Sequence, residues 1–302
     1  MAIYDLQLNG YKGVDFNDDA LSAAALRQAC AAVLADGGGC MLATVITDRL
    51  DRMEARIGRL ADLREADPLV AEVMVGIHVE GPFISPLPGF VGAHPPACVV
   101  PATPAAAERL VGAGRGLVRL VTLAPEHDTT FATTRWLSAQ GIVVAAGHCD
   151  PSVDVLDRAI DAGLSAFTHL GNGCPLMLHR HDNVIQRVLA ADRLRWVMVI
   201  PDGVHLPPAM IRTVVRAVGI DRVIAVSDAT AAGGMGPGRF RLAGQEVFVD
   251  GGGAAWAPDR SHFVGSTASM ADVRQVLQER VGLSPQEVRM LTEINPARAI
   301  AG

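Results

Sequence analysis

The chain is poor in aromatic residues and in cysteines, and both shortages narrow what it can be. Only 4% of its 302 residues are aromatic, so a large core must be built mostly from Ala, Val, Leu and Ile. There are five cysteines and no CxxC pair. An odd number without such a motif favours reduced thiols over a disulfide framework, and we therefore expect a cytoplasmic location.

Long apolar runs and strong charge are also missing. No run approaches the roughly 20 apolar residues of a membrane span. The opening residues, MAIYDLQLNG, lack the charged and apolar regions of a secretion signal. The net charge of −6 argues against nucleic acid as a partner. We expect neither a membrane nor a nucleic-acid partner, whereas a small phosphorylated molecule stays compatible because one pocket can be basic within an acidic protein.

What the chain does contain is a regular alternation of two kinds of segment. Short, almost continuously apolar runs are typical of strands that are covered on both faces. They alternate with longer runs rich in Ala and Leu, which are typical of helices. Strands are predicted at residues 3–9, 40–46, 72–80, 117–123, 142–148, 166–169, 196–201 and 223–228. Helices are predicted near residues 18–36, 50–65, 104–113, 128–140, 151–162, 183–193, 207–218, 267–281 and 285–294, with helix-start candidates at Asp18, Thr103, Asp128 and Ser284.

Eight strands separated by helices predict an α/β fold of the (β/α)8 TIM-barrel type, with a doubly wound open sheet as the main alternative. Such barrels run beyond roughly 250 residues as one domain, and no linker is evident, so residues 1–302 are interpreted as a single domain. The loops 81–103, 170–182 and 229–262 are unusually long and follow strand ends, which is the active face of a barrel. Segments 239–242 and 246–249 in the last loop predict a small hairpin.

Polar side chains close several of these strands, and on a closed barrel they converge at one mouth. One carboxylate and two imidazoles, with one position left for water, form a good ligand set for Zn²⁺ or Fe²⁺. Taken singly, a strand-end histidine is more often structural, and an aspartate in SDAT more often caps a helix or turn. Their coincidence at one mouth favours a metal site. The residues concerned are Glu80, His148, His169 and Asp228.

Six motifs, taken in order, resemble the N-acetylglucosamine-6-phosphate deacetylase family of the amidohydrolase superfamily. They are HVEGPF, AAGHCDPS, THLGNGCP, DGVHL, VSDATAAGG and NPARA, and the opening LQLNGYKGVDFND resembles the family's first barrel strand. The resemblance spans residues 5 to 300. It implies a metal-dependent hydrolase that converts the acetamide of N-acetylglucosamine 6-phosphate to glucosamine 6-phosphate and acetate.

The resemblance implies a role for each matching residue at the reacting end. Glu80, His148 and His169 match the ligands of one divalent metal, Zn or Fe. Asp228 matches the catalytic aspartate, which acts as general base. His94, in its protonated form, is expected to polarise the amide carbonyl. One metal rather than two is implied because glutamine and asparagine stand where other amidohydrolases have His-x-His; these are Gln7 and Asn9.

Other matches concern the sugar phosphate. Arg180 and His205 match groups that bind the phosphate, and in family dimers the arginine can come from the neighbouring subunit. A homodimer is therefore expected, with an amino sugar phosphate as the small-molecule partner. Further substrate contacts are implied at Ala93, Asn172, Gly173, Asp202, Gly203, Val204, Phe263, Val264 and Gly265.

The chain also departs from the family pattern. It begins at the first barrel strand and stops at NPARAIAG, so the family's flanking β-sandwich is expected to be absent. Gly171 replaces an aromatic residue and Cys174 a methionine, which predicts an altered pocket beside the sugar. Two alternatives stay open: an amidohydrolase that deacylates another N-acyl amino sugar, and a non-catalytic sugar-phosphate-binding protein. The intact ligand set and Asp228 count against the second.

Two further features receive structural interpretations. The Gly-rich run 231–238 lacks the Lys-Ser/Thr ending of a phosphate loop, so we interpret it as a mobile loop beside the site. His78 lies two residues before Glu80 and shares its strand face. Nothing assigns it a ligand role, and we expect it to support the site from within the barrel.

Overall fold

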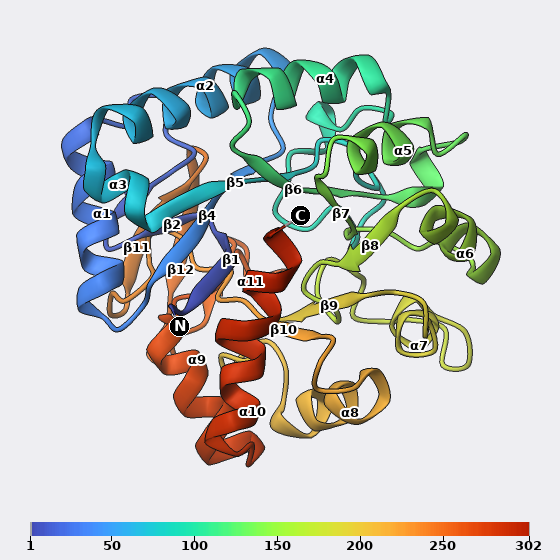
Figure 1. The fold of residues 1–302 in the computed structure, drawn as a ribbon. Helices are drawn as coiled ribbons and strands as arrows, with labels where there is room; N and C mark the ends of the chain where they lie inside the picture. The colour runs from blue at the N-terminus through green and yellow to red at the C-terminus, as the bar shows by residue number, and fades with distance from the viewer. Residues whose placement is uncertain (1, 302) are drawn as a thin grey trace.

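Eight parallel strands form a ring at the centre of the computed structural model, which describes residues 2–301 (Figure 1). Around the ring they follow the order of the chain, and helices lie between them, which confirms the predicted (β/α)8 barrel. The strands are β1 (Tyr4–Leu8), β4 (Cys40–Ile46), β5 (Met74–Glu80), β6 (Val118–Leu123), β7 (Val143–Ala146), β8 (Leu164–Phe167), β9 (Trp196–Val199) and β10 (Val223–Ala225).

The helices cover the outside of the ring. They are α1 (Ala23–Ala35), α2 (Leu50–Ala66), α3 (Pro68–Val73), α4 (Pro104–Ala113), α5 (Ala132–Ala139), α6 (Val153–Asp161), α7 (Val184–Leu189), α8 (Pro208–Val218), α9 (Met270–Val276), α10 (Pro285–Arg289) and α11 (Asn295–Ile300). Two π-helical turns, Leu277–Val281 and Met290–Ile294, extend α9 and α10. None of the helices in residues 2–301 has the length and apolar character needed to cross a membrane.

The ring closes between β10 and β1 through residues just beyond β10. The Asp228 amide donates to the Gln7 carbonyl at 2.9 Å, and the Asn9 amide donates to the Ala229 carbonyl at 2.7 Å. Beneath these bonds, the buried Asp5 carboxylate accepts from the Ser227 amide at 3.1 Å and from its hydroxyl at 2.5 Å. Closing the barrel therefore also places Asp228 at its mouth.

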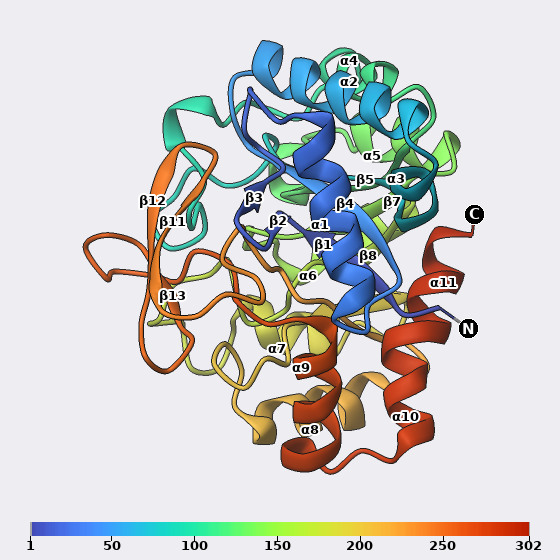
Figure 2. The same ribbon diagram turned by 90° about the vertical axis from the view of Figure 1, so that its left-hand side faces the viewer.

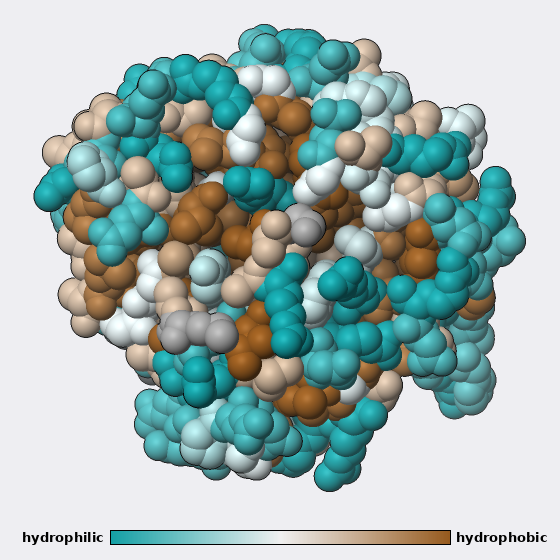
Figure 3. Space-filling model, in the orientation of Figure 1, coloured by the Kyte–Doolittle hydropathy of each residue, from teal (hydrophilic) through white to brown (hydrophobic). Residues whose placement is uncertain are grey.

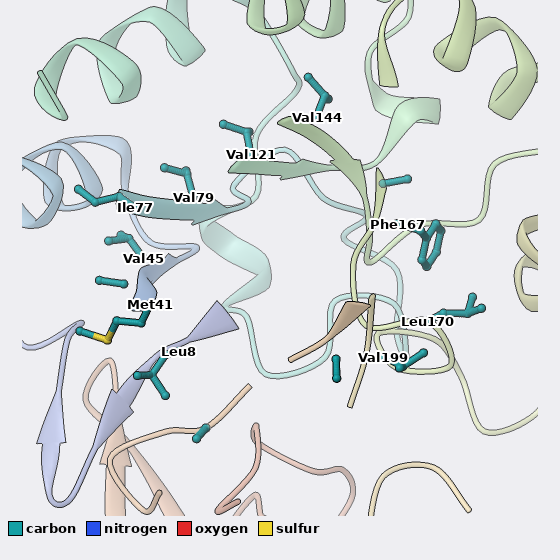
Figure 4. Close-up of a cluster of buried hydrophobic side chains, with 14 of the residues drawn as sticks. Leu8, Met41, Val45, Ile77, Val79, Val121, Val144, Phe167, Leu170 and Val199 are labelled. Carbon is teal, nitrogen blue, oxygen red and sulfur yellow. The ribbon is translucent and has the colours of Figure 1, made fainter. Parts of the chain in front are cut away.

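Side chains on the two faces of the strands form separate layers. Those that point outward pack against the helices (Figure 4), and they include Leu8, Met41, Val45, Ile77, Val79, Val121, Val144, Phe167, Leu170 and Val199. Inside the ring, a second apolar cluster includes Leu42, Leu120, Ala166, Met198 and Ile224, and Ala299 of α11 packs against it. This cluster, the apolar floor, fills the barrel interior beneath the polar residues at the mouth.

The two ends of the barrel are built differently. Figure 2 shows the small sheet of β11 (Gly238–Leu242), β12 (Gln245–Val249) and β13 (Ala255–Trp256) at one end, and both termini at the other. At the termini end, hydrophobic residues gather toward the middle of the face and hydrophilic ones around its rim (Figure 3). The predicted hairpin is confirmed as β11 and β12, whereas the third strand, β13, was not predicted.

Several predicted boundaries are wrong, each for a local reason. The third barrel strand begins at Met74 because Asp67 caps the short helix α3 before it, accepting from the amides of Leu69 and Val70. Helix α1 starts after Ser22, while Asp18 accepts from the Ala20 amide in a turn.

The other helix starts are closer to prediction. Thr103 and Ser284 are confirmed as N-caps, and each accepts from an amide in the first turn of its helix. Asp128 lies three residues before the actual N-cap of α5, Phe131, yet still accepts from the amides of Thr133 and Thr134. It therefore caps the helix from outside it.

The buried Asp5 carboxylate, where the ring closes between β1 and β10, makes the free energy of unfolding depend on pH. Burial raises the pKa of Asp5 from 3.8 to about 6, against the hydrogen bonds from Ser227. The folded protein thus binds this proton more tightly than the unfolded chain. The stability it contributes is complete below pH 3.8 and is lost as the pH rises through about 6.

We predict that Asp5→Asn gains stability relative to the wild type between about pH 4 and about pH 7, by at most about 3 kcal/mol. Asparagine keeps the acceptor oxygen and cannot ionise. Urea unfolding at several pH values measures the difference, with Asp62→Asn, at an exposed carboxyl, as the matched control. An unchanged difference between wild type and Asp5→Asn across this range would contradict the prediction.

Candidate metal centre and active site

Three buried side chains meet at the ends of β5, β7 and β8. Glu80 is the last residue of β5, while His148 and His169 each stand two residues beyond their strands. Glu80 Oε1 lies 2.9 Å from His169 Nε2 and 3.4 Å from His148 Nε2. One ligand atom from each residue lies within 4.8 Å of the others. The structure thus brings together the three residues predicted to hold a metal.

The backbone turns sharply at these positions. His148, His169 and Asp228 have φ angles of 52°, 34° and 51°. Left-handed backbone is uncommon for residues other than glycine and is found where the surrounding structure enforces it, often at active sites. Immediately after a strand, this turn directs each side chain into the cavity at the barrel mouth rather than along the strand.

The orientation of His148 is fixed by its second nitrogen. Nδ1 lies 2.7 Å from the Phe90 carbonyl, which can only accept, so Nδ1 carries a hydrogen and Nε2 is the nitrogen that can bind a metal. The ring packs closely against Gly173, whose φ is +60° and where a Cβ would lie 2.9 Å from Nδ1. A metal-binding histidine needs this arrangement, with one nitrogen anchored and the other free.

The donor set fits a divalent cation. A carboxylate and two imidazole nitrogens gather around one buried point, where an unpaired charge would be costly. Burial opposes ionisation of Glu80, but hydrogen bonds with His148 and His169 hold its pKa well below the ordinary value. His169 Nδ1, by contrast, has no hydrogen-bond partner among residues 2–301.

Two amides support the two carboxylates. Gln7 Nε2 donates to Glu80 Oε1 at 2.9 Å, and Asn9 Nδ2 donates to Asp228 Oδ1 at 2.7 Å. Burial, and next the charge of Glu80, raise the pKa of Asp228 to about 6. Gln7 and Asn9 thus orient acidic groups at the mouth of the barrel.

His94 differs from its predicted state. The Thr47 amide donates to His94 Nδ1 at 3.3 Å, and the Thr47 hydroxyl lies 2.8 Å from the same nitrogen. Because Nδ1 accepts, the hydrogen of the neutral ring sits on Nε2, which lies 4.0 Å from Glu80 Oε2. Burial, and next the charge of His148, lower the pKa of His94 to about 3. Burial therefore disfavours the expected protonated form of His94, and the hydrogen-bond geometry makes its Nε2–H the available donor.

His205 is held by Asp202. Its Nδ1 lies 2.7 Å from Asp202 Oδ2, while Asp202 Oδ1 accepts from the amides of Val204 and His205. Burial alone would raise the pKa of Asp202, but the hydrogen bond and charge of His205 bring it below the ordinary value. Asp202 therefore orients His205 and does not itself face the cavity.

A cavity of about 480 Å³ connects these groups. The predicted residues that line it are Glu80, Ala93, His94, His148, His169, Asn172, Gly173, His205, Asp228, Phe263 and Gly265. Five others do not, namely Arg180, Asp202, Gly203, Val204 and Val264. Arg180 is exposed in the loop before α7. The prediction missed Gly89, Gly92, Trp256, Ser261 and His262, which lie in long loops without a strand-end pattern.

The Gly-rich run 231–238 lies beside the cavity without forming part of its wall. The Gly13 amide donates to the Ala231 carbonyl at 2.7 Å, and Lys12 Nζ donates to the Gly234 carbonyl at 2.8 Å. None of residues 231–238 lines the cavity. The run packs on the turn between β2 (Gly10–Tyr11) and β3 (Val14–Asp15), and its Ala232 shares an apolar cluster with the cavity-lining Ile46 and Leu242.

Leu206 occupies the space that a side chain at position 171 would need, where the family has an aromatic residue. Gly171 has a φ of +91°, and a Cβ there would lie 2.8 Å from Leu206 Cδ2. The space that a side chain at position 171 would enter is thus occupied by Leu206. An aromatic residue at this left-handed position would have to displace Leu206, so the cavity wall here is formed by the glycine backbone together with Cys174.

Known proteins resemble this chain over nearly its whole length, although no family model matches it. It is 30% identical to the N-acetylgalactosamine-6-phosphate deacetylase of Escherichia coli O157:H7, covering 99% of this chain and 77% of that protein. It is 34% identical to the human N-acetylglucosamine-6-phosphate deacetylase, covering 98% and 73%. These relatives are longer, and residues 2–301 contain no flanking β-sandwich.

Solved structures agree. The N-acetyl-D-glucosamine-6-phosphate deacetylase of Mycobacterium smegmatis superposes with a TM-score of 0.89 at 31% identity, covering 99% of this chain and 77% of that one. The Pasteurella multocida enzyme gives 0.87 at 28% identity, covering 99% and 76%. With the barrel and these relatives together, the chain belongs to the N-acetylglucosamine-6-phosphate deacetylase family, whose members are metal-dependent amidohydrolases.

Proposed function

We propose that the chain hydrolyses the acetamide of N-acetylglucosamine 6-phosphate to glucosamine 6-phosphate and acetate. The observation that carries the proposal is a buried donor set, Glu80, His148 and His169, beside a buried Asp228 at the mouth of a deacetylase-like barrel. A non-catalytic sugar-phosphate-binding protein would have no use for a proton acceptor at this point. The geometry therefore supports hydrolysis rather than binding alone.

Zn²⁺ or Fe²⁺ is the cofactor that we propose, one ion per chain. Imidazole and carboxylate ligands suit both ions, and availability decides between them. When bound by Glu80, His148 and His169, the cation supplies Lewis-acid activation of water and of the amide carbonyl. The Phe90 carbonyl and the Gln7 amide keep two of the three ligands in place.

Asp228 is the group that moves the proton. Asn9 holds one carboxylate oxygen at 2.7 Å, which leaves the other available to accept a proton from the attacking water. The same carboxyl then gives the proton to the departing nitrogen, since an unprotonated amine leaves poorly. The left-handed backbone at Asp228 directs the carboxyl into the cavity for both steps.

His94 stabilises the charge that develops on the carbonyl oxygen. Its Nε2–H points away from the Thr47 amide, which binds the opposite ring nitrogen, and the residue lines the cavity. A positioned donor of this kind typically contributes about 3 kcal/mol to the transition state. A neutral donor is sufficient for this role, because the hydrogen bond strengthens as the oxygen gains charge.

The substrate's phosphate lies at the other end of the cavity in this proposal. His205, oriented by Asp202, is one anchor. Arg180 would reach the phosphate from a neighbouring subunit, since in its own chain it lies outside the cavity. A contact between subunits is supported by Leu176 and Met177 of the same loop, which are 97% and 89% exposed.

The barrel and its loops would form one catalytic domain, because β11–β13 and Ala93 share an apolar cluster at the mouth. A cytoplasmic location is proposed as well. All five cysteines are free thiols in the structure, as is typical of a reducing compartment.

A second substrate is favoured by a specific observation. Relatives at 30% and 33% identity, from Escherichia coli O157:H7 and Shewanella, are N-acetylgalactosamine-6-phosphate deacetylases. The sugar epimer differs at one hydroxyl, and the pocket beside it is altered at Gly171 and Cys174.

The substrate assignment is tested by acetate release from a panel. We expect the metal-loaded protein to act on N-acetylglucosamine 6-phosphate with a kcat/KM at least about tenfold above that for the galactosamine epimer and for unphosphorylated N-acetylglucosamine. Preference for the epimer would make the second candidate the function. Activity on none of the three, with metal bound, would refute both.

The dimer is tested by sedimentation. The wild type is expected to sediment as a dimer at micromolar concentration, and the double variant Leu176→Glu, Met177→Glu as a monomer, because two buried charges oppose the contact. Both side chains are so exposed in the single chain that folding should be unaffected. A wild type that stays monomeric would contradict the proposal.

Asp228→Asn and His148→Ala separate proton transfer from metal binding. Asp228→Asn should keep the fold and the metal content but lose at least about 10³-fold in kcat, because asparagine cannot take up the proton. His148→Ala should instead lower the metal-to-protein ratio, because one of three ligands is gone. Metal analysis and acetate release are measured on both variants. Near-native turnover in Asp228→Asn, or full metal content in His148→Ala, would show the assignments to be mistaken.

A further inference from the structure

The cavity has few cations with which to hold a phosphate. None of the described residues that line it is lysine or arginine. Lys12, the only lysine of the chain, is engaged by the Gly234 carbonyl and Asp36. Of the imidazoles in the cavity, His94, His148 and His169 surround the carboxylate of Glu80. The remaining two, His205 and His262, are therefore the candidates for binding an anion within one chain.

His262 belongs to the same wall as His205. The Ala257 amide donates to the His262 carbonyl at 3.0 Å, and the Val264 amide to the Ala255 carbonyl at 3.0 Å, so the segment folds back as a narrow hairpin. The Phe263 ring lies 4.4 Å from the Trp256 ring and 5.0 Å from the His205 ring, centroid to centroid. Phe263 thus connects the two histidine-bearing loops across one side of the cavity.

A chain of hydrogen bonds orients the His262 ring. The Ser261 hydroxyl donates to Asp259 Oδ1 at 2.7 Å, and the Ser261 amide donates to the same oxygen at 3.0 Å. These bonds lower the pKa of Asp259, so its carboxylate is ionised and can only accept. The single hydroxyl hydrogen is therefore used, and Ser261 Oγ accepts from His262 Nδ1 at 2.8 Å.

The direction of these hydrogen bonds, from His262 to Ser261 and from Ser261 to Asp259, has two consequences. Nδ1 of His262 is a donor, so a ring that also donates from Nε2 into the cavity carries both hydrogens and a positive charge. The carboxylate of Asp259, relayed through Ser261, compensates that charge. Conversely, Ser261 gives its hydrogen to Asp259 rather than to His262, so it is not an activated nucleophile.

His205 and His262 are thereby built alike. Each has Nδ1 tied to a carboxylate, directly to Asp202 in one case and through Ser261 to Asp259 in the other. Each leaves Nε2 as the free nitrogen of a residue that lines the cavity. Charge-assisted hydrogen bonds from such rings to phosphate oxygens are stronger than neutral ones.

We propose that His262, held by Ser261 and Asp259, is a second phosphate anchor beside His205, and that it supplies this subsite with a second imidazole donor within a single chain. The inference rests on the proposed function, because it presupposes a phosphorylated sugar in the cavity. It assigns to His262 a contact with the substrate's phosphate and no part in breaking the amide bond.

The test measures binding of the reaction product by calorimetry on metal-loaded protein. His262→Gln is expected to weaken binding of glucosamine 6-phosphate at least about tenfold and to leave binding of glucosamine unchanged, since only the former carries phosphate. Ser261→Ala should weaken it in the same direction by a smaller factor. His127→Gln, a half-buried histidine outside the cavity and far in sequence from the proposed subunit contact, is the matched control and should bind both as the wild type does.

Equal binding of glucosamine 6-phosphate by His262→Gln and the wild type would overturn the inference. So would an equal loss for glucosamine, which would indicate a general packing defect. A wild type that prefers neither ligand would overturn it as well. Acetate release separates this from the proposed function: a wild type that deacetylates while His262→Gln keeps its KM refutes the anchor alone. A phosphate-dependent loss of binding in a protein that releases no acetate refutes the deacetylase alone.

Discussion

The buried charge of Glu80 is the constraint around which the rest of the barrel mouth is arranged. A carboxylate removed from water is destabilising by several kcal/mol unless it is paired and hydrogen-bonded. Here its Oε1 meets Gln7 from β1, His148 beyond β7 and His169 beyond β8. Partners from three separate strands can gather on one oxygen only if the ring is closed, so the site and the fold depend on each other.

The barrel interior changes from apolar to polar along its axis, toward the mouth where the charged groups lie. An apolar floor that includes Leu42, Leu120 and Met198 gives way to a polar belt, in which His78 Nε2 lies 2.8 Å from the Thr122 hydroxyl and Thr122 lies 2.7 Å from that of Thr168. Burial lowers the pKa of His78 to about 4, so it stays neutral beneath the ligand set. His78 hydrogen-bonds Thr122 between the apolar floor and the charged groups at the mouth. This is the supporting role that was expected of it, and not that of a metal ligand.

Much of this could be predicted from the sequence, because the signals are local. Nearly continuous apolar runs indicate buried parallel strands, and a polar residue that closes such a run must lie at the barrel mouth. Glu80, His148, His169 and Asp228 are all of this kind. Their identification required the period of the strands and the closure of the ring, and no knowledge of side-chain conformation.

What could not be predicted depends on contacts between distant loops. The position of the hydrogen on the His94 ring follows from the amide of Thr47, which lies 47 residues away along the chain. Asp202 was expected to touch the substrate, yet it bonds the amides of Val204 and His205 and turns away from the cavity. His262 stands in a loop without strand or helix periodicity. The identity of a residue does not show which group will hydrogen-bond to the side of it that faces away from the cavity.

The hydrogen-bond partner of Nδ1 is also what distinguishes the histidines of this cavity. A backbone carbonyl, from Phe90, holds Nδ1 of His148 and turns Nε2 toward Glu80 and the metal position. A backbone amide, from Thr47, makes Nε2–H of His94 the available donor. Carboxylates behind His205 and His262 hold Nδ1 of each ring and leave Nε2 toward the cavity. The same side chain is thus adapted to metal binding, to carbonyl polarisation and to anion binding by the atom behind it, and an acidic chain with one lysine can hold an anionic sugar without placing a fixed cation beside its metal ligands.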